Sequence, residues 1–197
     1  MTDRQLILAS GSPRRRQLLE LIGVAFVVKP ADVDETPLIA ENPDTYATRA
    51  ARDKALEVAA NHPGRLVLGA DTVVEVDQEI LGKPASADDA AKMLKRLSGR
   101  SHVVHTALAL VIDSTVHEVV DSAQVQFLDL TDEMIRWYVS TGEPMDKAGA
   151  YAIQGLGGLL VAGVKGSPHT VVGLPVHRLP ELFAAHDLDF WSQLAEI

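Results

Sequence analysis

The N-terminal segment spanning residues 6–16 brings together residue types that bind anions. It reads LILASGSPRRR, an apolar strand followed by a Ser-Gly-Ser-Pro turn and three arginines. Ser12 is a favourable N-cap, and Pro13 is a favourable first residue for a helix that runs to Leu21 and ends at Gly23. The start of such a helix attracts anions through its free amides and the positive end of its dipole.

Side chains around this helix start add donors, because hydroxyls and guanidinium groups both donate hydrogen bonds to phosphate oxygens. These donors are Ser10, Ser12, Arg14 and Arg15. A capped surface helix with a solvated basic turn explains the segment equally well, since three arginines in one turn repel one another. The anion site therefore needs support from phosphate-binding residues elsewhere in the chain.

A carboxylate in the middle of an apolar run is the second candidate. Asp71 lies within LVLGADTVVEV, residues 66–76, which predicts a long buried strand. A buried carboxylate requires a cation, a metal or several hydrogen bonds, and Gly69 would let a ligand or another backbone approach closely. A structural aspartate held by backbone amides or an arginine is the alternative. The rarity of carboxylates in apolar strands favours a functional role.

Lys54 is the third candidate, because it shares one helix face with three alanines at helical spacing. A lysine on such a face either extends past the core to water or points into a cleft. On the same helix, Arg49 and Asp53 are four residues apart and are expected to form an exposed pair.

Together, these residues form a set that suits phosphoanhydride cleavage. The cations are Arg14, Arg15, Lys54 and Lys83, and the carboxylates are Glu35 and Asp71. Taken alone, Lys83 is explained by a solvated turn between Gly82 and Pro84, and Glu35 by a solvated acidic loop. Carboxylates are hard oxygen ligands for Mg²⁺ or Mn²⁺, and the cations match a polyphosphate. The chain contains no GxxxxGK[ST] motif, no HExxH motif and no GxSxG elbow. A P-loop kinase, a zinc peptidase and a serine hydrolase are therefore poorly supported.

Composition limits the class of protein. The 197 residues, of which 47% are hydrophobic, predict a single domain over residues 1–197. A net charge of −9 argues against a broad nucleic-acid-binding face, and the absence of cysteine fits a reducing compartment. We recognise neither a signal peptide nor an apolar run of about 18 residues. These observations predict a cytoplasmic protein without a membrane partner.

Strand-like and helix-like segments alternate, which is typical of an α/β fold. The expected helices span residues 13–21, Pro43 to near residues 62–64, Ser86 to Gly99, 131–139 and about 179–186, with Ser86 and Asp89 forming a capping box for the third. The expected strands span residues 6–9, 25–29, 66–76, 103–112, 116–128 and 159–164. The fourth and fifth strands should be adjacent and antiparallel across the turn at residues 113–114.

Motifs along nearly the whole chain resemble the Maf family of nucleoside triphosphate pyrophosphatases. In order, they are ASGSPRR, the acidic VDE loop, RxxK within ARDKA, GADT, GKP, LSGRxH, DKAGAYAIQG and VVGLP. Each fragment is weak alone, but their joint order is specific. The segment after DKAG resembles the branch that acts on dTTP and UTP rather than the branch that acts on 7-methyl-GTP.

The resemblance implies a Maf/ITPase-like α/β fold with two lobes, a long curved mixed sheet flanked by helices, and a central cleft. It also implies a homodimer that hydrolyses a nucleoside triphosphate with a divalent cation. Asp71 matches the proposed proton acceptor, and the substrate-selecting positions correspond to Arg14, Thr72 and Gln154. The other polar cleft positions correspond to Ser10, Arg15, Glu35, Lys54 and Lys83. Pro168 departs from the family pattern and has no N–H for a backbone contact.

Physical roles follow for these positions. A metal held by Glu35, Asp71 or both would bridge phosphate oxygens, while a carboxylate activates water and positive side chains stabilise the leaving pyrophosphate. The Gln154 amide matches the O4 and N3–H edge shared by thymine and uracil. Two alternatives remain open, namely a non-enzymatic nucleotide-binding regulator of cell division and a pyrophosphatase for 7-methyl-GTP or other modified nucleotides.

Overall fold

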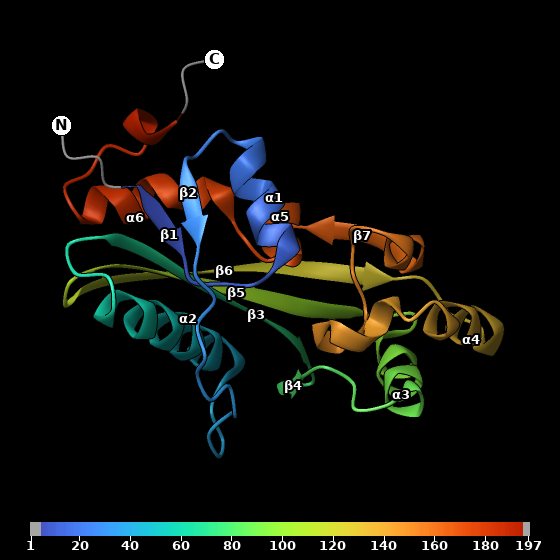
Figure 1. Cartoon of the computed structure of the whole chain (residues 1–197). Helices are drawn as coiled ribbons and strands as arrows, with labels where there is room; N and C mark the ends of the chain where they lie inside the picture. Colours follow the sequence, from blue (N-terminus) through green and yellow to red (C-terminus); the bar gives the residue numbers. More distant parts are fainter. Residues whose placement is uncertain (1–4, 195–197) are drawn as a thin grey trace. The chain divides into compact units, whose positions relative to one another are not determined.

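A seven-stranded mixed sheet is the centre of the computed structural model, which describes residues 5–194 (Figure 1). Six strands follow the order β2-β1-β3-β5-β6-β7, and β4 pairs with β3. The strands span Leu6–Leu8 (β1), Phe26–Val28 (β2), Leu66–Val76 (β3), Glu79–Leu81 (β4), Ser101–Ile112 (β5), Thr115–Phe127 (β6) and Val161–Lys165 (β7). Strand β1 is parallel to β2 and β3, whereas the β3–β4 and β6–β7 pairs are antiparallel. The predicted α/β fold with a mixed sheet is therefore confirmed.

The chain divides into two compact units, and strands β3, β5 and β6 each contribute residues to both. The first unit contains the chain up to Asp71, the segment Thr106–Asp121 and the chain from Gly173 onward. The second contains Thr72–His105 and Ser122–Val172. The single domain over residues 1–197 and the central cleft stay predictions.

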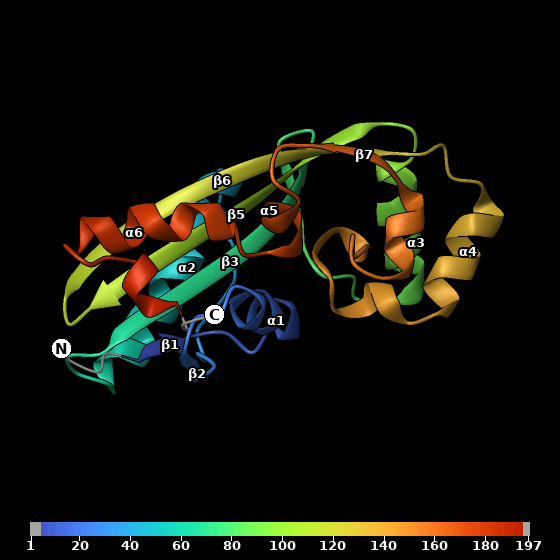
Figure 2. The same cartoon turned by 90° about the horizontal axis from the view of Figure 1, so that it is seen from above.

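Helices cover both faces of the sheet in the first unit. They span Pro13–Leu21 (α1), Pro43–Ala60 (α2) and Leu179–Ala185 (α6), with short 3-10 turns at Val176–Arg178 (η4) and Trp191–Gln193 (η5). Helix α2 lies on one face of the strands, and α1 and α6 lie on the other (Figures 1 and 2). Pro180 stands in the first turn of α6, where its missing N–H removes no helical hydrogen bond.

Close packing of α2 on β3 depends on a glycine. A Cβ atom on Gly69 would lie 2.1 Å from the carbonyl oxygen of Ala51 and 2.9 Å from the Cβ of Ala55. No side chain fits at this distance, so the small-residue face of α2 and Gly69 together let the helix backbone approach the strand. The sequence was consistent with the close approach of either a ligand or another backbone at Gly69, and the structure shows the backbone of α2 there.

The second unit has its own apolar core, built on the ends of the long strands. Its helices span Ala87–Leu97 (α3), Asp132–Ser140 (α4) and Pro168–Val172 (α5), with 3-10 turns at Glu143–Asp146 (η1), Ala148–Ala150 (η2) and Leu156–Leu160 (η3). Helices α3 and α4 pack against each other (Figures 1 and 2). Leu94, Phe127 and Tyr138 are among its fully buried side chains. No helix among the described residues is long and apolar enough to span a membrane.

Most expected helix boundaries agree with the structure to within a few residues. The capping box of α3 is present, since the Ser86 hydroxyl accepts from the Asp89 amide. Ser12 occupies the N-cap position of α1, but its side chain makes no capping hydrogen bond. Residues 159–160, expected in a strand, belong to η3 instead, and the short strand β4 and helix α5 were not expected.

Candidate active site

Asp71 is buried in β3 and its cation is Lys54. The Lys54 Nζ donates to Asp71 Oδ1 at 2.6 Å, and the two residues are only 8% and 6% exposed. Lys54 projects from α2 toward the strand that Gly69 lets it approach. Of the two readings left open for Lys54, extension past the core to water is therefore excluded. The cation that a carboxylate in an apolar strand requires is a lysine of the neighbouring helix.

Glu35 joins the same ammonium group from the loop that precedes α2. Its Oε1 lies 2.9 Å from Lys54 Nζ, and about half of the Glu35 side chain remains exposed. Lys54 therefore holds two carboxylates, one buried and one open to solvent. The structure thus brings together three of the predicted site residues from three different segments.

Tyr46 of α2 holds the backbone of this acidic loop through a hydrogen bond. Its hydroxyl donates to the carbonyl oxygen of Glu35 at 2.7 Å, and its ring is buried. Burial raises the pKa of Tyr46 to about 12, and the negative charges of Asp71 and Glu35 act in the same direction. The phenol therefore stays protonated as a donor and fixes the chain next to the Glu35 carboxylate.

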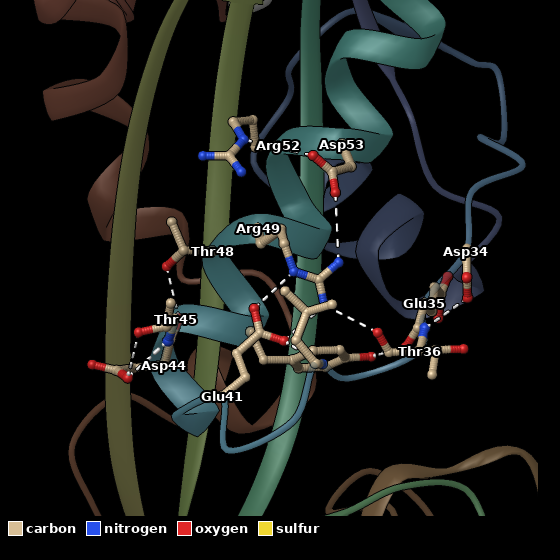
Figure 3. Close-up of polar contacts among 12 residues, drawn as sticks. Asp34, Glu35, Thr36, Glu41, Asp44, Thr45, Thr48, Arg49, Arg52 and Asp53 are labelled. Atoms are coloured by element: carbon tan, nitrogen blue, oxygen red, sulfur yellow. Dashed lines mark hydrogen bonds and ion pairs between the residues drawn. The ribbon is translucent and has the colours of Figure 1, made fainter.

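Arg49, one turn further along α2, holds the end of the same loop (Figure 3). Its Nε and Nη2 donate to the two carboxylate oxygens of Glu41 at 2.7 Å, and Nη2 also reaches the carbonyl of Thr36 at 3.1 Å. This fork geometry is specific to arginine. The Glu41 pKa falls to about 2, chiefly through the Arg49 hydrogen bonds. The Arg49–Asp53 pair expected from spacing is present only at 3.7 Å, so the sequence prediction missed the main partner.

Ser10 and Arg15 are bound to each other at the junction between β1 and α1. Arg15 Nη1 donates to Ser10 Oγ at 2.9 Å, and its Nε donates to the carbonyl of Gly173 at 2.8 Å. The Ser12 amide also donates to Ser10 Oγ at 3.3 Å. Burial lowers the Arg15 pKa, while the negative charge of Asp71 opposes this change. Arg15 is thus a buried cation that organises the junction rather than a solvated arginine.

Arg14 differs from its neighbour because it is half-buried and its guanidinium has no hydrogen bond or ion pair within residues 5–194. Arg16 is exposed and pairs with Glu20 at 2.8 Å on its own helix. Of the three arginines, only Arg14 therefore combines partial burial with an unengaged guanidinium. It is the member of the basic turn best suited to an external anion.

The predicted metal ligands, Asp71 and Glu35, fit one kind of metal site. Within the described part of the chain, no group of three or more His, Cys, Asp or Glu side chains is arranged to hold a metal. Glu35 and Asp71 each have one carboxylate oxygen on the Lys54 ammonium, and Mg²⁺ or Mn²⁺ is commonly bound by one or two carboxylates together with substrate phosphates. The donor set therefore fits a metal that arrives with a polyphosphate.

The remaining predicted residues belong to the second unit. Thr72 follows Asp71 along β3, Lys83 is exposed in the turn between β4 and α3, and Gln154 is exposed before η3. The Lys83 turn is held by the Gly149 amide, which donates to the Gly82 carbonyl at 3.0 Å. Pro168, the departure from the family pattern, is the first residue of α5, a position that tolerates the missing N–H.

Tyr46 and the Arg49–Glu41 pair are two features of the site that no sequence pattern predicts. Both α2 residues lie one or two turns before Lys54 and act on the loop of residues 34–41. A glutamate eight positions before an arginine follows no helical spacing, so the pairing depends on how the loop folds back onto α2. The only available signal was a tyrosine on the apolar face of a helix, which also suits a core position.

The structure is therefore an α/β protein with a mixed sheet and a Lys54–Asp71 charge pair buried between α2 and β3. The family model described as Maf-like protein matches residues 5–186. The chain therefore belongs to the Maf family. Its relatives include a dTTP/UTP pyrophosphatase of Nitratidesulfovibrio vulgaris, 52% identical over 90% of this chain and 85% of that protein. One from Symbiobacterium thermophilum is 50% identical over 91% and 92%, and one from Myxococcus xanthus is 53% identical over 87% of each.

Among solved structures, a HAM1 protein from Coxiella burnetii matches with a TM-score of 0.43 and 19% identity, over 62% of this chain and 72% of that one. The Ham1 protein of Staphylococcus aureus matches with a TM-score of 0.43 and 15% identity, over 64% and 72%.

Proposed function

We propose that this protein hydrolyses dTTP and UTP to the nucleoside monophosphate and pyrophosphate by attack of water on the α-phosphate. One observation carries the proposal, namely the buried Lys54 ammonium that holds both Asp71 and Glu35. The relatives named dTTP/UTP pyrophosphatase, which are about half identical over most of the chain, support the substrate. Modified pyrimidine nucleotides that keep the same base edge are further candidates.

Asp71 is the proposed proton acceptor for the attacking water. Its Oδ1 is occupied by Lys54 at 2.6 Å, which fixes the orientation of the carboxylate within the strand. A carboxylate held in one orientation can align a water for in-line attack without reorganising during the reaction. Lys54 therefore has two proposed roles. It positions Asp71, and its positive charge stabilises the negative charge that develops on the leaving pyrophosphate.

A divalent cation, Mg²⁺ or Mn²⁺, would be held by Glu35 and Asp71 together with phosphate oxygens, where it would polarise the phosphorus and neutralise phosphate charge. The exposed half of Glu35 leaves its carboxylate accessible to such a cation. Tyr46 and Arg49 keep the loop of Glu35 in place. Their contribution is to the position of the Glu35 carboxylate.

The triphosphate is proposed to contact Arg14 and Lys83, two cations without a protein partner among the described residues. Ser10 and Arg15 shape the junction beside Arg14 and place a buried positive charge there. Thr72 is proposed to contact substrate next to the proton acceptor. Phosphoryl transfer depends mainly on positioning and on positive charge, which these residues provide.

Base selection is assigned to Gln154. Its amide offers one donor and one acceptor, which match the O4 and N3–H edge of thymine and uracil, whereas cytosine presents the reverse pattern. The side chain is exposed and has no hydrogen bond to another of the described residues, so it is available to a ligand. The family resemblance also leads us to propose a homodimer, and the composition of the chain leads us to propose a cytoplasmic location.

The decisive experiment compares Asp71→Asn with wild-type protein on a panel of nucleoside triphosphates with Mg²⁺ or Mn²⁺. We expect wild-type protein to release pyrophosphate from dTTP and UTP, and the variant to lose nearly all of this activity while it remains folded. Asp88→Asn, at an exposed aspartate of α3, is the matched control and should keep full activity.

Three results would contradict the proposal. Binding of nucleotides without release of pyrophosphate would indicate the regulatory alternative. A preference of wild-type protein for 7-methyl-GTP would indicate the sister branch. Full activity of Asp71→Asn would remove Asp71 from the reaction.

A further inference from the structure

The backbone on both sides of Gln154 is held by two side chains from α4 and η1. Three amides of this segment donate to them, those of Ala152, Leu156 and Gly157. The first donates to the Tyr138 hydroxyl at 3.2 Å, and the other two donate to the Glu143 carboxylate at 3.0 and 2.8 Å. The proposed base-reading residue therefore lies between two anchored pieces of backbone.

The two anchoring side chains are also bound to each other. The Tyr138 hydroxyl donates to Glu143 Oε1 at 2.8 Å, and Tyr138 is fully buried. Burial by itself would raise the pKa of the Glu143 carboxyl, but hydrogen bonds from Gly157, Leu156 and Tyr138 outweigh it and lower that pKa. Glu143 is thus an ionised acceptor with three donors, which is an arrangement with strong and directional bonds.

Glycines let the segment lie directly against these anchors. Gly155 has φ +116° and ψ −152°, a conformation that residues with a Cβ avoid. A Cβ there would also lie 2.6 Å from Glu143 Oε2. A Cβ on Gly157 would lie 2.5 Å from the Tyr138 hydroxyl. The glycines of the Gln-Gly-Leu-Gly-Gly segment therefore let its backbone lie directly against the Glu143 carboxylate and the Tyr138 hydroxyl. This close packing leaves the segment little freedom to shift.

We propose that Glu143, bridged by Tyr138, is a positioning residue that sets base selectivity by fixing the backbone around Gln154. This inference rests on the proposed role of Gln154 in reading the base. An amide distinguishes the thymine or uracil edge from the cytosine edge only when its donor and acceptor are held in register. If the backbone relaxes, the Gln154 amide moves from the position at which it meets the base edge, and discrimination against the reversed edge falls.

A bracing role for Glu143 in the second unit is the alternative. A brace would lower stability or lower the rate with every nucleotide equally, because it would act on the fold as a whole. A positioning role changes the ratio between bases. The ratio of kcat/KM for dTTP to that for dCTP is therefore the quantity that separates the two roles.

The test is a double-mutant cycle of Glu143→Gln and Gln154→Ala, with kcat/KM measured for dTTP, UTP and dCTP. We expect Glu143→Gln to lower the dTTP-to-dCTP ratio about tenfold, because an uncharged amide keeps one acceptor where the carboxylate had two. In the Gln154→Ala background, the same change should leave the ratio unaltered. Glu133→Gln, at an exposed glutamate of α4, is the matched control.

A second variant, Tyr138→Phe, keeps the buried ring and removes only the bridging hydroxyl. It should shift the ratio in the same direction, and thermal melting shows whether each variant is folded. If Gln154→Ala leaves the wild-type ratio unchanged, the proposed role of Gln154 fails. If Gln154→Ala lowers the ratio but the two anchor variants do not, only the present inference fails. If both anchor variants unfold, or if kcat/KM falls equally with all nucleotides, Glu143 is a structural brace and the proposed positioning role is likewise overturned.

Discussion

The Lys54 ammonium lies 2.6 Å from Asp71 Oδ1, although the two residues are 17 positions apart and belong to a helix and a strand. Gly69 permits this contact, because a Cβ at that position would lie 2.1 Å from the backbone oxygen of Ala51. The smallest residue of the strand thus determines how near Lys54 can come to the Asp71 carboxylate.

Substitution of Gly69 by alanine should separate α2 from β3. We expect Gly69→Ala to lower the free energy of unfolding by about 1–3 kcal/mol, as overpacking of a dense core does. The rate of pyrophosphate release should fall by more than the loss of folded protein explains, because the Lys54–Asp71 distance changes. Chemical denaturation and pyrophosphate release measure the two effects. Gly82→Ala is the matched control, since a Cβ there meets nothing within 4 Å and should cost little.

Lys54→Met should destabilise the protein more than Asp71→Asn does. The methionine variant leaves a buried carboxylate without its cation, which costs about 3–5 kcal/mol when one partner of a buried pair is removed. In Asp71→Asn, Lys54 still pairs with Glu35 at 2.9 Å, so its charge stays compensated. Urea unfolding of both variants at pH 7 gives the comparison. Equal free energies of unfolding for the two variants would contradict the prediction that an unpaired buried Asp71 carboxylate is costly.

Arg49→Lys should loosen the loop that carries Glu35, because a lysine cannot bind both Glu41 oxygens and the Thr36 carbonyl in one fixed geometry. We expect a loss of about 1 kcal/mol in stability, in line with lost hydrogen bonds at a partly exposed site. The concentration of Mg²⁺ or Mn²⁺ needed for half-maximal rate should rise. Arg16→Lys, which alters an exposed pair with Glu20, should change neither quantity.

Phosphate binding should depend on Arg14 and Lys83. Arg14→Ala and Lys83→Ala each remove a cation proposed to bind the triphosphate, so kcat/KM should fall by about tenfold or more. Lys92→Ala removes the same charge from the exposed face of α3 and serves as the control. Equal kinetics in all three variants would exclude the basic turn as the anion site.

The buried His102 should make the protein less stable in mild acid. Burial lowers its pKa to about 4 from 6.5, and its Nε2 lies 2.8 Å from the Tyr151 hydroxyl. Between these values the unfolded chain binds a proton that the folded protein excludes, so stability falls as pH decreases from 6.5 through 4. The loss is about 3 kcal/mol for one group with a shift of this size.

The measurement compares urea unfolding of wild-type protein and His102→Gln at pH 7 and pH 4.5. The variant should show a smaller loss of stability between the two pH values. His177→Gln, changed at an exposed histidine, controls for the removal of a histidine elsewhere. If His102→Gln loses as much stability as wild-type protein between pH 7 and pH 4.5, His102 is not the group responsible.

Local patterns in the sequence were enough to predict the long strands, most helices and the types of residue proposed to carry the chemistry, although not β4 or α5. Hydrophobic periodicity and caps are local, so β3 at residues 66–76 and α1 at residues 13–21 follow directly from the pattern. Asp71 and Lys54 each stood out locally, because a charged side chain conflicts with an apolar strand or a small-residue face. The ordered motifs then indicated the family.

The pairing of the charged side chains in the site follows from the three-dimensional fold and not from their spacing. Arg15 is bonded to Ser10 and to the carbonyl of Gly173, which is 158 positions away, and neither partner could be predicted from local spacing. Glu143, which no local pattern marked, anchors the amides beside Gln154. Such contacts depend on how loops fold back and on which helix packs on which strand. They are long-range properties of the fold that residue spacing along one element does not encode.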